Sequence, residues 1–218
     1  SVVLGIWSWE CPCAEFLVLP EENLDLVPAT IKDDVAVFTE PVAAAYRILE
    51  QITIMPDDRV IVLGDGKLGQ LISQVLWTST KNLVCAGKHE WKLDLLRDQQ
   101  IPVVATNEPI ERGADIVIEA TGSHEGLSRA FELVRPEGTI VLKTTVTHPT
   151  ALELSNPVIN EVTVVGSRCG PFRPALDALA GGEIEVRPLV TETYELRDAE
   201  VALQRAQMAD TMKVILHM

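Results

Sequence analysis

The chain has 218 residues and a formal net charge of −14, and 47% of its residues are hydrophobic. That length allows one large domain, or one domain with part of another, and the composition suits a globular core. No apolar run reaches the roughly 18 residues of a membrane span, and no secretory leader is recognisable at Ser1, so we expect a cytoplasmic protein without a membrane partner. The negative charge argues against nucleic acid as a partner, because its phosphates would be repelled.

Short β-branched strands alternate with helices from Asp58 onward. Strands are expected at 60–63, 82–86, 103–105, 115–120, 139–143 and 161–166, and helices at 68–78, 90–98, 125–134 and 174–180. The helix over 125–134 is expected to stop at the Arg-Pro-Glu-Gly sequence of 135–138. This alternation predicts an α/β fold with a doubly wound parallel (Rossmann) sheet in the order 3-2-1-4-5-6, covered on both faces.

The two ends of the chain do not belong to this alternating pattern. Residues 1–35 contain only strand-like pieces at 14–19 and 24–27, and we expect a strand at 189–194, a helix at 198–208 and a last strand at 213–216. The chain therefore divides into residues 1–35, a dinucleotide-binding domain over 36–185, and a C-terminal segment over 186–218. Since neither end has a role in the sheet, we expect the ends to pack together or onto a further part.

The four cysteines are Cys11, Cys13, Cys85 and Cys169. They lack the repeated Cys-x-x-Cys spacing of a structural zinc site and the pattern of a secreted disulfide framework. Cys85 lies in an apolar strand pattern, which predicts a buried small residue. One residue separates Cys11 from Cys13, which is poor spacing for metal binding or reaction, so reduced thiols are the default interpretation.

An apolar segment breaks into glycines within residues 59–69, which read Arg-Val-Ile-Val-Leu-Gly-Asp-Gly-Lys-Leu-Gly. Gly64 permits a tight turn, Gly66 lets the backbone approach a phosphate, and Gly69 lets the next helix pack closely on the strand. The turn is therefore predicted to bind a dinucleotide pyrophosphate at the helix N-terminus. Its predicted cofactor-binding residues are Gly64, Gly66, Lys67, Leu68 and Gly69. The alternative is an ordinary strand-to-helix turn that binds no ligand.

Gly87, Lys88 and His89 follow the second strand, where a sheet that prefers NAD usually presents Asp or Glu to the ribose 2′-hydroxyl. Gly87 leaves room for a 2′-phosphate, and Lys88 and His89 offer charge-assisted hydrogen bonds to it. We therefore favour NADP(H) over NAD(H) as the cofactor. Two alternatives stay open: the basic pair can be a solvated turn, and a shift of one or two residues in register would bring Glu90 to the ribose.

Small polar residues follow the fourth and fifth strands. Thr121 and Gly122 end the fourth strand, and Thr144 holds the equivalent place after the fifth. In this topology both turns face the cofactor across the crevice, so these residues are candidates for ribose or nicotinamide contacts. The Thr-Gly sequence is equally consistent with a simple turn.

Four segments in order carry a resemblance to a known family. They are Phe-Thr-Glu-Pro-Val-Ala-Ala-Ala at 38–45, the glycine turn at 60–71, Arg-Pro-Glu-Gly-Thr-Ile-Val-Leu at 135–142 and Asn-Glu-Val-Thr-Val-Val-Gly-Ser at 160–167. With the tail from 189 to 216, they resemble the zinc-containing alcohol dehydrogenases of the medium-chain dehydrogenase/reductase superfamily. The resemblance covers nearly the whole chain. It implies hydride transfer between a nicotinamide cofactor and an alcohol or its ketone, with a small molecule as the substrate.

Members of that family begin with a catalytic domain that carries a zinc-binding cysteine and a Gly-His-Glu segment, and neither is found here. The chain opens where relatives show something like Gly-Ala-Phe-Ala-Glu-Tyr, against Cys-Pro-Cys-Ala-Glu-Phe at 11–16. The resemblance therefore implies that this chain is the C-terminal portion of such an enzyme, that residues 1–35 are a remnant of the catalytic domain, and that residues 186–218 return to it. It also implies that zinc is bound only in an intact enzyme, and that this chain alone turns over little substrate.

The resemblance assigns roles to two further residues. Glu40 matches the carboxylate that is a zinc ligand in polyol- and sugar-type members, although a helix N-terminal carboxylate favoured by the helix dipole is the alternative interpretation. Arg168 follows the sixth strand, from which it could reach the nicotinamide side of the cofactor or a dimer neighbour. The sixth strand of relatives often pairs across a dimer, which implies a homodimer here.

Two other function classes stay open from the sequence. One is a zinc-free NADPH reductase of the same superfamily, which would depend on the nicotinamide and a tyrosine or water. The other is a non-catalytic dinucleotide-binding module that acts as a sensor or a subunit.

Overall fold

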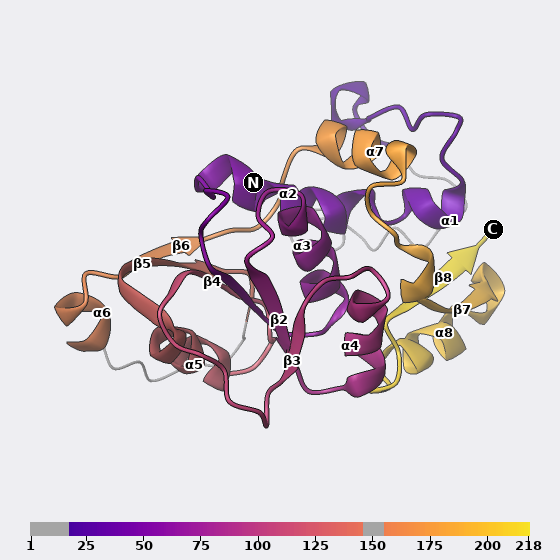
Figure 1. The fold of residues 1–218 in the computed structure, drawn as a ribbon. Coiled ribbons are helices and arrows are strands. Elements are labelled where there is room, and N and C mark those ends of the chain that lie inside the picture. Colours follow the sequence, from indigo (N-terminus) through magenta and orange to yellow (C-terminus); the bar gives the residue numbers. More distant parts are fainter. Residues whose placement is uncertain (1–17, 146–154) are drawn as a thin grey trace. The chain divides into compact units, whose positions relative to one another are not determined.

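The computed structural model describes residues 18–145 and 155–218, and it divides into two compact units (Figure 1). Residues 28–188 form the larger unit, and residues 18–27 belong with residues 189–218 in the smaller one. Within the described ranges, no helix combines the length and apolarity needed to cross a membrane.

The larger unit contains a six-stranded sheet. Its strands are β1 (Val60–Leu63), β2 (Leu83–Gly87), β3 (Val103–Ala105), β4 (Ala114–Glu119), β5 (Val134–Leu142) and β6 (Thr163–Gly166). All neighbouring strands are parallel and their order is β3-β2-β1-β4-β5-β6. This confirms the predicted doubly wound α/β sheet. The strand order reverses between β1 and β4, which is where open sheets of this class form a crevice at the carboxyl ends of their strands.

Helices connect the strands and cover the sheet. They are α1 (Asp33–Ala36), α2 (Thr39–Gln51), α3 (Lys67–Trp77), α4 (Glu90–Arg97), α5 (Glu125–Leu133), α6 (Ser155–Ile159) and α7 (Phe172–Gly181). Because parallel crossovers are right-handed, α3 and α4 lie on one face of the sheet and α5 lies on the other (Figure 1). The helix expected over 174–180 is α7, which ends at Gly181 because Gly182 adopts φ 70°, a left-handed conformation that ends the helix.

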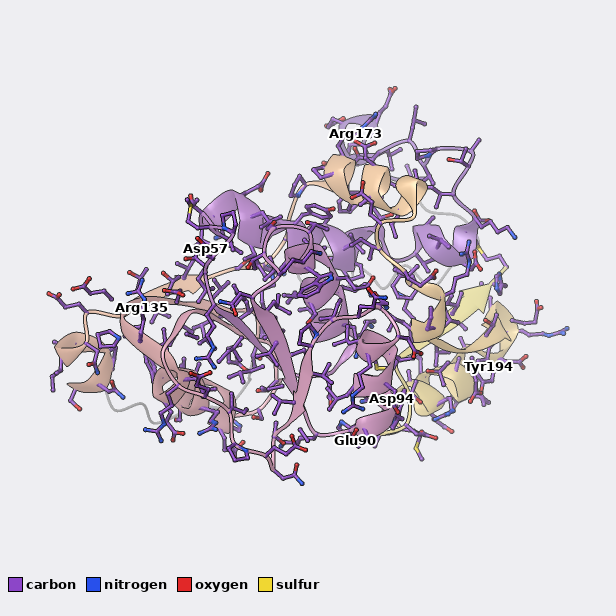
Figure 2. All side chains as sticks on the ribbon, in the orientation of Figure 1. Asp57, Glu90, Asp94, Arg135, Arg173 and Tyr194 are labelled. Atoms are coloured by element: carbon purple, nitrogen blue, oxygen red, sulfur yellow. The ribbon has the colours of Figure 1, made fainter. Side chains whose placement is uncertain are left out.

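Buried apolar side chains from both faces of the sheet hold this unit together. β1 is buried along its whole length, as expected for a central parallel strand. One cluster fills the space between the sheet and α5; it includes Ile61, Leu63, Val117, Phe131, Leu133 and Ile140. On α2 and α3, Ile48, Leu71 and Val75 are likewise buried. Many acidic side chains lie at the surface instead, and Asp57, Glu90 and Asp94 are examples (Figure 2).

The predicted start of one strand is wrong. The helix expected over 125–134 ends at Leu133, within one residue of the prediction, but the strand expected from 139 already begins at Val134. The pairing passes from Ala114 with Val134 to Ile116 with Thr139, so the intervening residues bulge out of the ladder. Pro136 cannot donate a ladder hydrogen bond, and a bulge is a position where a strand tolerates it.

The smaller unit holds a second sheet. β7 (Val190–Glu195) and β8 (Lys213–His217) are parallel neighbours, joined through the 3-10 helix η3 (Leu196–Asp198) and α8 (Ala199–Ala206). The 3-10 helix η2 (Arg187–Leu189) precedes β7. Arg205 on α8 donates to Glu192 on β7 at 2.5 Å and to Asp210 before β8 at 2.5 Å, which connects all three segments.

The predictions near the N-terminus have mixed outcomes. Most of the strand-like piece at 14–19 lies outside the described residues. The predicted strand at 24–27 is wrong, because these residues form no strand and follow the 3-10 helix η1 (Glu21–Asn23). Leu24 and Leu26 are exposed there, so no sheet face buries them as a strand would require.

Candidate functional site

The glycine turn after β1 is closely packed against its neighbours. Gly64 has φ +115°, and a Cβ on it would lie 2.5 Å from the carbonyl oxygen of Ala120 after β4. A Cβ on Gly69 would lie 1.9 Å from the carbonyl oxygen of Gly64. Only glycine therefore fits at these two positions, because the surrounding atoms belong to the backbone.

One side of the turn remains open. Gly66 is the N-cap of α3, and a Cβ on it would have no atom within 4 Å. The first backbone N–H groups of a helix lack intrahelical partners and carry the positive end of the helix dipole. An anion can therefore approach the backbone at Gly66 without steric conflict.

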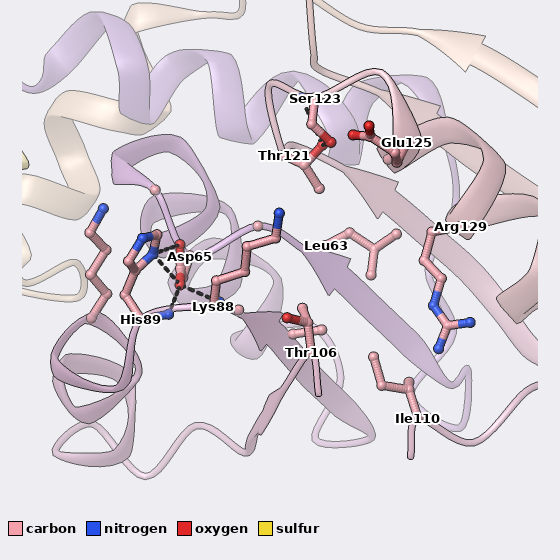
Figure 3. Close-up of a pocket in the computed structure, with 16 residues that line it drawn as sticks. Leu63, Asp65, Lys88, His89, Thr106, Ile110, Thr121, Ser123, Glu125 and Arg129 are labelled. Carbon is pink, nitrogen blue, oxygen red and sulfur yellow. Dashed lines mark hydrogen bonds and ion pairs between the residues drawn. The ribbon is translucent and has the colours of Figure 1, made fainter. Parts of the chain in front are cut away.

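A cavity of about 590 Å³ lies beside the turn, at the carboxyl ends of β1, β2 and β4 (Figure 3). Its lining comprises Leu63, Gly64, Asp65, Gly66, Ala86, Gly87, Lys88, His89, Lys92, Thr106, Ile110, Thr121, Ser123, Glu125, Gly126 and Arg129. Basic side chains outnumber acidic ones in this lining, although the whole chain is strongly acidic. That size and composition suit the adenosine part of a dinucleotide.

The basic residues predicted after β2 do line the cavity, but a carboxylate accompanies them. The Asp65 carboxylate accepts hydrogen bonds from the backbone N–H of Lys88 at 2.6 Å and from that of His89 at 2.7 Å. The His89 ring nitrogen Nδ1 lies 3.0 Å from the same oxygen (Figure 3). The sequence did not predict Asp65 as a site residue, because it lies more than 20 positions before the end of β2, where its carboxylate is bound.

Gly87 is the reason why the Asp65 side chain fits there. A Cβ on Gly87 would lie 2.5 Å from the Asp65 Cβ and 2.6 Å from its Oδ2. The room that the sequence predicted at Gly87 is therefore filled by this side chain. The end of β2 therefore carries the Asp65 carboxylate in addition to the basic side chains that the sequence predicted.

Opposite the β2 side, the wall after β4 is polar. Glu125 and Ser123 project from it (Figure 3). The pKa of the Glu125 carboxyl is lowered, chiefly because it accepts hydrogen bonds from its own backbone N–H and from Ser123, and to a lesser extent because the Lys88 ammonium lies nearby. The charge of the Lys88 ammonium therefore acts across the cavity, on the Glu125 carboxylate.

The predicted residues after β4 and β5 meet each other directly. The Thr144 hydroxyl oxygen accepts from the backbone N–H of Gly122 at 2.9 Å. Thr121 lines the cavity, and its hydroxyl donates to the buried Glu119 carboxylate at 2.6 Å. These contacts hold the two turns side by side at the switch point, although Gly122 and Thr144 themselves do not line the cavity.

A second group of charged residues surrounds the start of α2. Glu40, the candidate metal ligand, is exposed on α2, and its charge acts on both Lys67 and Lys143. Burial lowers the pKa of Lys67, and the Glu40 carboxylate partly offsets that shift. Burial lowers the pKa of Lys143 to about 8.

Lys143 was not predicted as a site residue. Its ammonium donates to the carbonyl oxygens of Ala44 at 2.8 Å and Arg168 at 2.9 Å, and to the Ser167 hydroxyl at 3.2 Å. Lys143 thereby joins the end of β5 to α2 and to the segment after β6. The sequence signal was a lysine that ends an otherwise apolar strand.

The remaining predicted residues lie away from the cavity lining. Lys67, Leu68 and Gly69 are on the α3 side of the turn, and Arg168 has an exposed side chain. Among residues 18–145 and 155–218, no three His, Cys, Asp or Glu side chains come together to hold a metal ion. These residues do not form a zinc site around Glu40.

Comparisons with known proteins agree with this geometry. Residues 33–218 match the family described as the glucose dehydrogenase C-terminus. The sorbitol dehydrogenase of Halalkalibacterium halodurans is 24% identical over 220 residues, which cover 93% of this chain and 64% of that enzyme. The chain therefore spans less than two thirds of that relative.

Two solved structures share the fold, and their cofactors differ. A dehydrogenase from Sinorhizobium meliloti bound to NADP has a TM-score of 0.84 at 22% identity, with 96% of this chain and 67% of that chain covered. A short chain alcohol dehydrogenase from Escherichia coli complexed with NADH has a TM-score of 0.84 at 20% identity, over 96% and 67% of the two chains. The match to the glucose dehydrogenase C-terminus family extends over most of this chain. The chain therefore belongs to that family, within the zinc-type alcohol and polyol dehydrogenases of the medium-chain dehydrogenase/reductase superfamily.

Proposed function

We propose that this chain is the dinucleotide-binding part of an alcohol or polyol dehydrogenase, and that it binds NADP(H) in preference to NAD(H). The observation that carries the first part is the juxtaposition of the glycine turn with the cavity. Gly66 leaves the start of α3 open to a diphosphate, and the adjoining cavity of about 590 Å³ accepts the adenosine.

Lys88 supports the preference for NADP(H). Its side chain lines the cavity at the end of β2, and in the described part of the chain no hydrogen bond or ion pair engages its ammonium. A 2′-phosphate beside it would gain a charge-assisted hydrogen bond, which a ribose 2′-hydroxyl would form only weakly. The related structures do not decide this point, because one contains NADP and the other NADH.

The nicotinamide cofactor would supply the hydride acceptor or donor for a small alcohol or ketone. The turns after β4 and β5, fixed to each other by the hydrogen bond from Gly122 to Thr144, would support the nicotinamide half on the far side of the switch point. Glu40 would serve as a zinc ligand only where further ligands from outside the described residues complete the site. Arg168 would contact the nicotinamide side or a neighbouring subunit.

The setting of the intact enzyme also belongs to this proposal. We expect it to act in the cytoplasm and to form a homodimer through the region of β6, which is one of the two edge strands of the sheet. An edge strand presents unpaired backbone groups that a second copy can pair with.

Titration of the 218-residue chain with NADPH and with NADH, followed by nicotinamide fluorescence, tests the proposal. We expect saturable binding of both, with the lower Kd for NADPH. Lys88→Ala should weaken NADPH binding by roughly three- to tenfold and leave NADH nearly unchanged, since a charge-assisted hydrogen bond at a partly exposed site contributes about 0.7–1.4 kcal/mol. Lys32→Ala removes the same charge from an exposed position outside the cavity lining and is the matched control. Absence of binding would contradict the dinucleotide site, and equal or tighter NADH binding would contradict the preference.

A further inference from the structure

Asp65 stands in the position where a Rossmann sheet holds its cofactor-discriminating carboxylate. That carboxylate ordinarily belongs to the residue at the end of the second strand, about 20 residues after the first glycine, and accepts from the ribose 2′-hydroxyl. Here the end of β2 is Gly87, which has no side chain. The Asp65 side chain lies within 2.5–2.8 Å of where a Gly87 side chain would begin, so its carboxylate occupies the space of the missing one.

The Asp65 side chain is held in this place from three directions. Both Lys88 and His89 donate their backbone N–H groups to Oδ2, and the His89 ring lies 3.1 Å from Oδ1. The carboxylate is only 9% exposed, yet it lines the cavity. A buried anion that is fixed by backbone donors cannot swing away when a ligand enters.

We propose that Asp65 is the residue that discriminates at the ribose 2′ position, and that it acts against Lys88. This inference rests on the proposed function, because it requires a dinucleotide in the cavity. The Asp65 carboxylate repels a 2′-phosphate and tolerates a 2′-hydroxyl, whereas the Lys88 ammonium attracts the phosphate. The Asp65 carboxylate also accepts from the two backbone N–H groups that could otherwise donate to a phosphate oxygen. The acidic side of the discrimination is therefore set by a residue of the glycine turn, and Lys88 at the end of β2 opposes it.

Asp65→Asn is the most direct test, because it removes the charge and keeps an oxygen acceptor for both backbone N–H groups. In the 218-residue chain, we expect the ratio of NADH Kd to NADPH Kd to rise by about fivefold or more. Asp98→Asn removes one negative charge from the opposite end of α4 and should leave the ratio within about twofold of the wild type. Circular dichroism before each titration establishes that the variants are folded.

A relocation pair provides the second test. Asp65→Gly alone should raise the ratio as Asp65→Asn does, and Asp65→Gly with Gly87→Asp should lower it again, because the carboxylate then comes from the end of β2. Asp65→Gly also removes the atoms that a Gly87 side chain would meet. If Asp65→Asn does not fold, this pair decides the matter in the same way.

The outcomes separate the two proposals. If the wild-type chain binds neither nucleotide, the proposed function fails and this inference fails with it. If the wild type binds but the ratio is the same in Asp65→Asn, the inference is refuted while the proposed function stands. A ratio that does not fall on relocation would also refute it.

Discussion

The close fit between Gly87 and Asp65 makes a quantitative prediction about stability. Gly87→Ala would place its Cβ 2.5 Å from the Asp65 Cβ, 2.6 Å from Oδ2 and 2.8 Å from Cγ. Carbon atoms in favourable contact lie about 3.5–4.0 Å apart, so each of these contacts overlaps by roughly 1 Å. The Asp65 side chain must therefore move, and its hydrogen bonds to the Lys88 and His89 backbone must lengthen or break.

The cost can be estimated from those hydrogen bonds. A hydrogen bond to a charged group contributes about 1.5–3 kcal/mol, and overpacking a well-packed site costs about 1–3 kcal/mol. We expect Gly87→Ala to lower the free energy of unfolding by about 2–3 kcal/mol. Asp65→Gly should lower it by about 1–3 kcal/mol, because it leaves the two backbone donors without their acceptor.

The double variant distinguishes this explanation from a general weakness of β2. Once Asp65 is replaced by glycine, the methyl group that Gly87→Ala introduces has space, so the double variant should lose at least about 1 kcal/mol less than the sum of the two single losses. Urea unfolding followed by far-ultraviolet circular dichroism measures all four proteins. Gly166→Ala, where an added Cβ has no atom within 4 Å, is the control and should be nearly neutral. Losses that add within about 0.5 kcal/mol would refute the steric argument.

Three further predictions concern other parts of the larger unit. Gly69→Ala places a Cβ 1.9 Å from the Gly64 carbonyl oxygen, so it should lower the free energy of unfolding by about 2–4 kcal/mol. It should also weaken NADPH binding at least about tenfold, and an unchanged Kd for NADPH would contradict the role of the turn. Burial lowers the pKa of Lys143 to about 8, so between about pH 8 and pH 10.5 the unfolded chain binds more protons than the folded chain. The free energy of unfolding of the wild type, relative to that of Lys143→Met, should therefore rise by up to about 3 kcal/mol between about pH 7 and pH 10.5. A difference in urea unfolding that stays constant with pH would refute this. Burial raises the pKa of the Cys85 thiol to about 12, whereas Cys169 is exposed. When the folded chain is alkylated at about pH 8, peptide mass spectrometry should therefore find Cys169 modified and Cys85 unmodified. Cys85 should react only after unfolding.

The fold followed from the sequence because its signals are local. Each strand of the central sheet is a short β-branched run, and each helix has an apolar stripe with recognisable ends, so periodicity and glycine punctuation were sufficient. The error at 135–138 shows the limit of such signals. Proline and glycine there predict a helix stop outside any strand. Pairing with β4 instead makes them part of a bulge within β5, and this depends on a strand more than 15 residues away.

The site was predictable only where its contacts are close in sequence. The glycine turn was found because strand, turn and helix follow one another without interruption. The relation between Asp65 and Gly87 was missed because the two residues meet through the pairing of β1 with β2, which places Leu63 beside Ala86. The same holds for Lys143, whose acceptors belong to α2 and to the segment after β6. Sequence patterns identify the elements, but they do not show which side chains the sheet brings together.

The negative charges of the chain should also weaken the binding of an anionic cofactor, and Asp98→Asn measures how much one distant charge contributes. Asp98 follows the last residue of α4 and lies nine residues beyond His89, which corresponds to about 13.5 Å along the helix axis. At that distance two unit charges in water interact by about 0.3 kcal/mol, and salt at physiological ionic strength reduces this to about 0.1 kcal/mol. Asp98→Asn should therefore change the Kd of NADPH by less than about 1.3-fold, against about fivefold or more for Asp65→Asn. If the two substitutions strengthened NADPH binding equally, the overall charge of the chain, and not the carboxylate within the cavity, would determine the affinity.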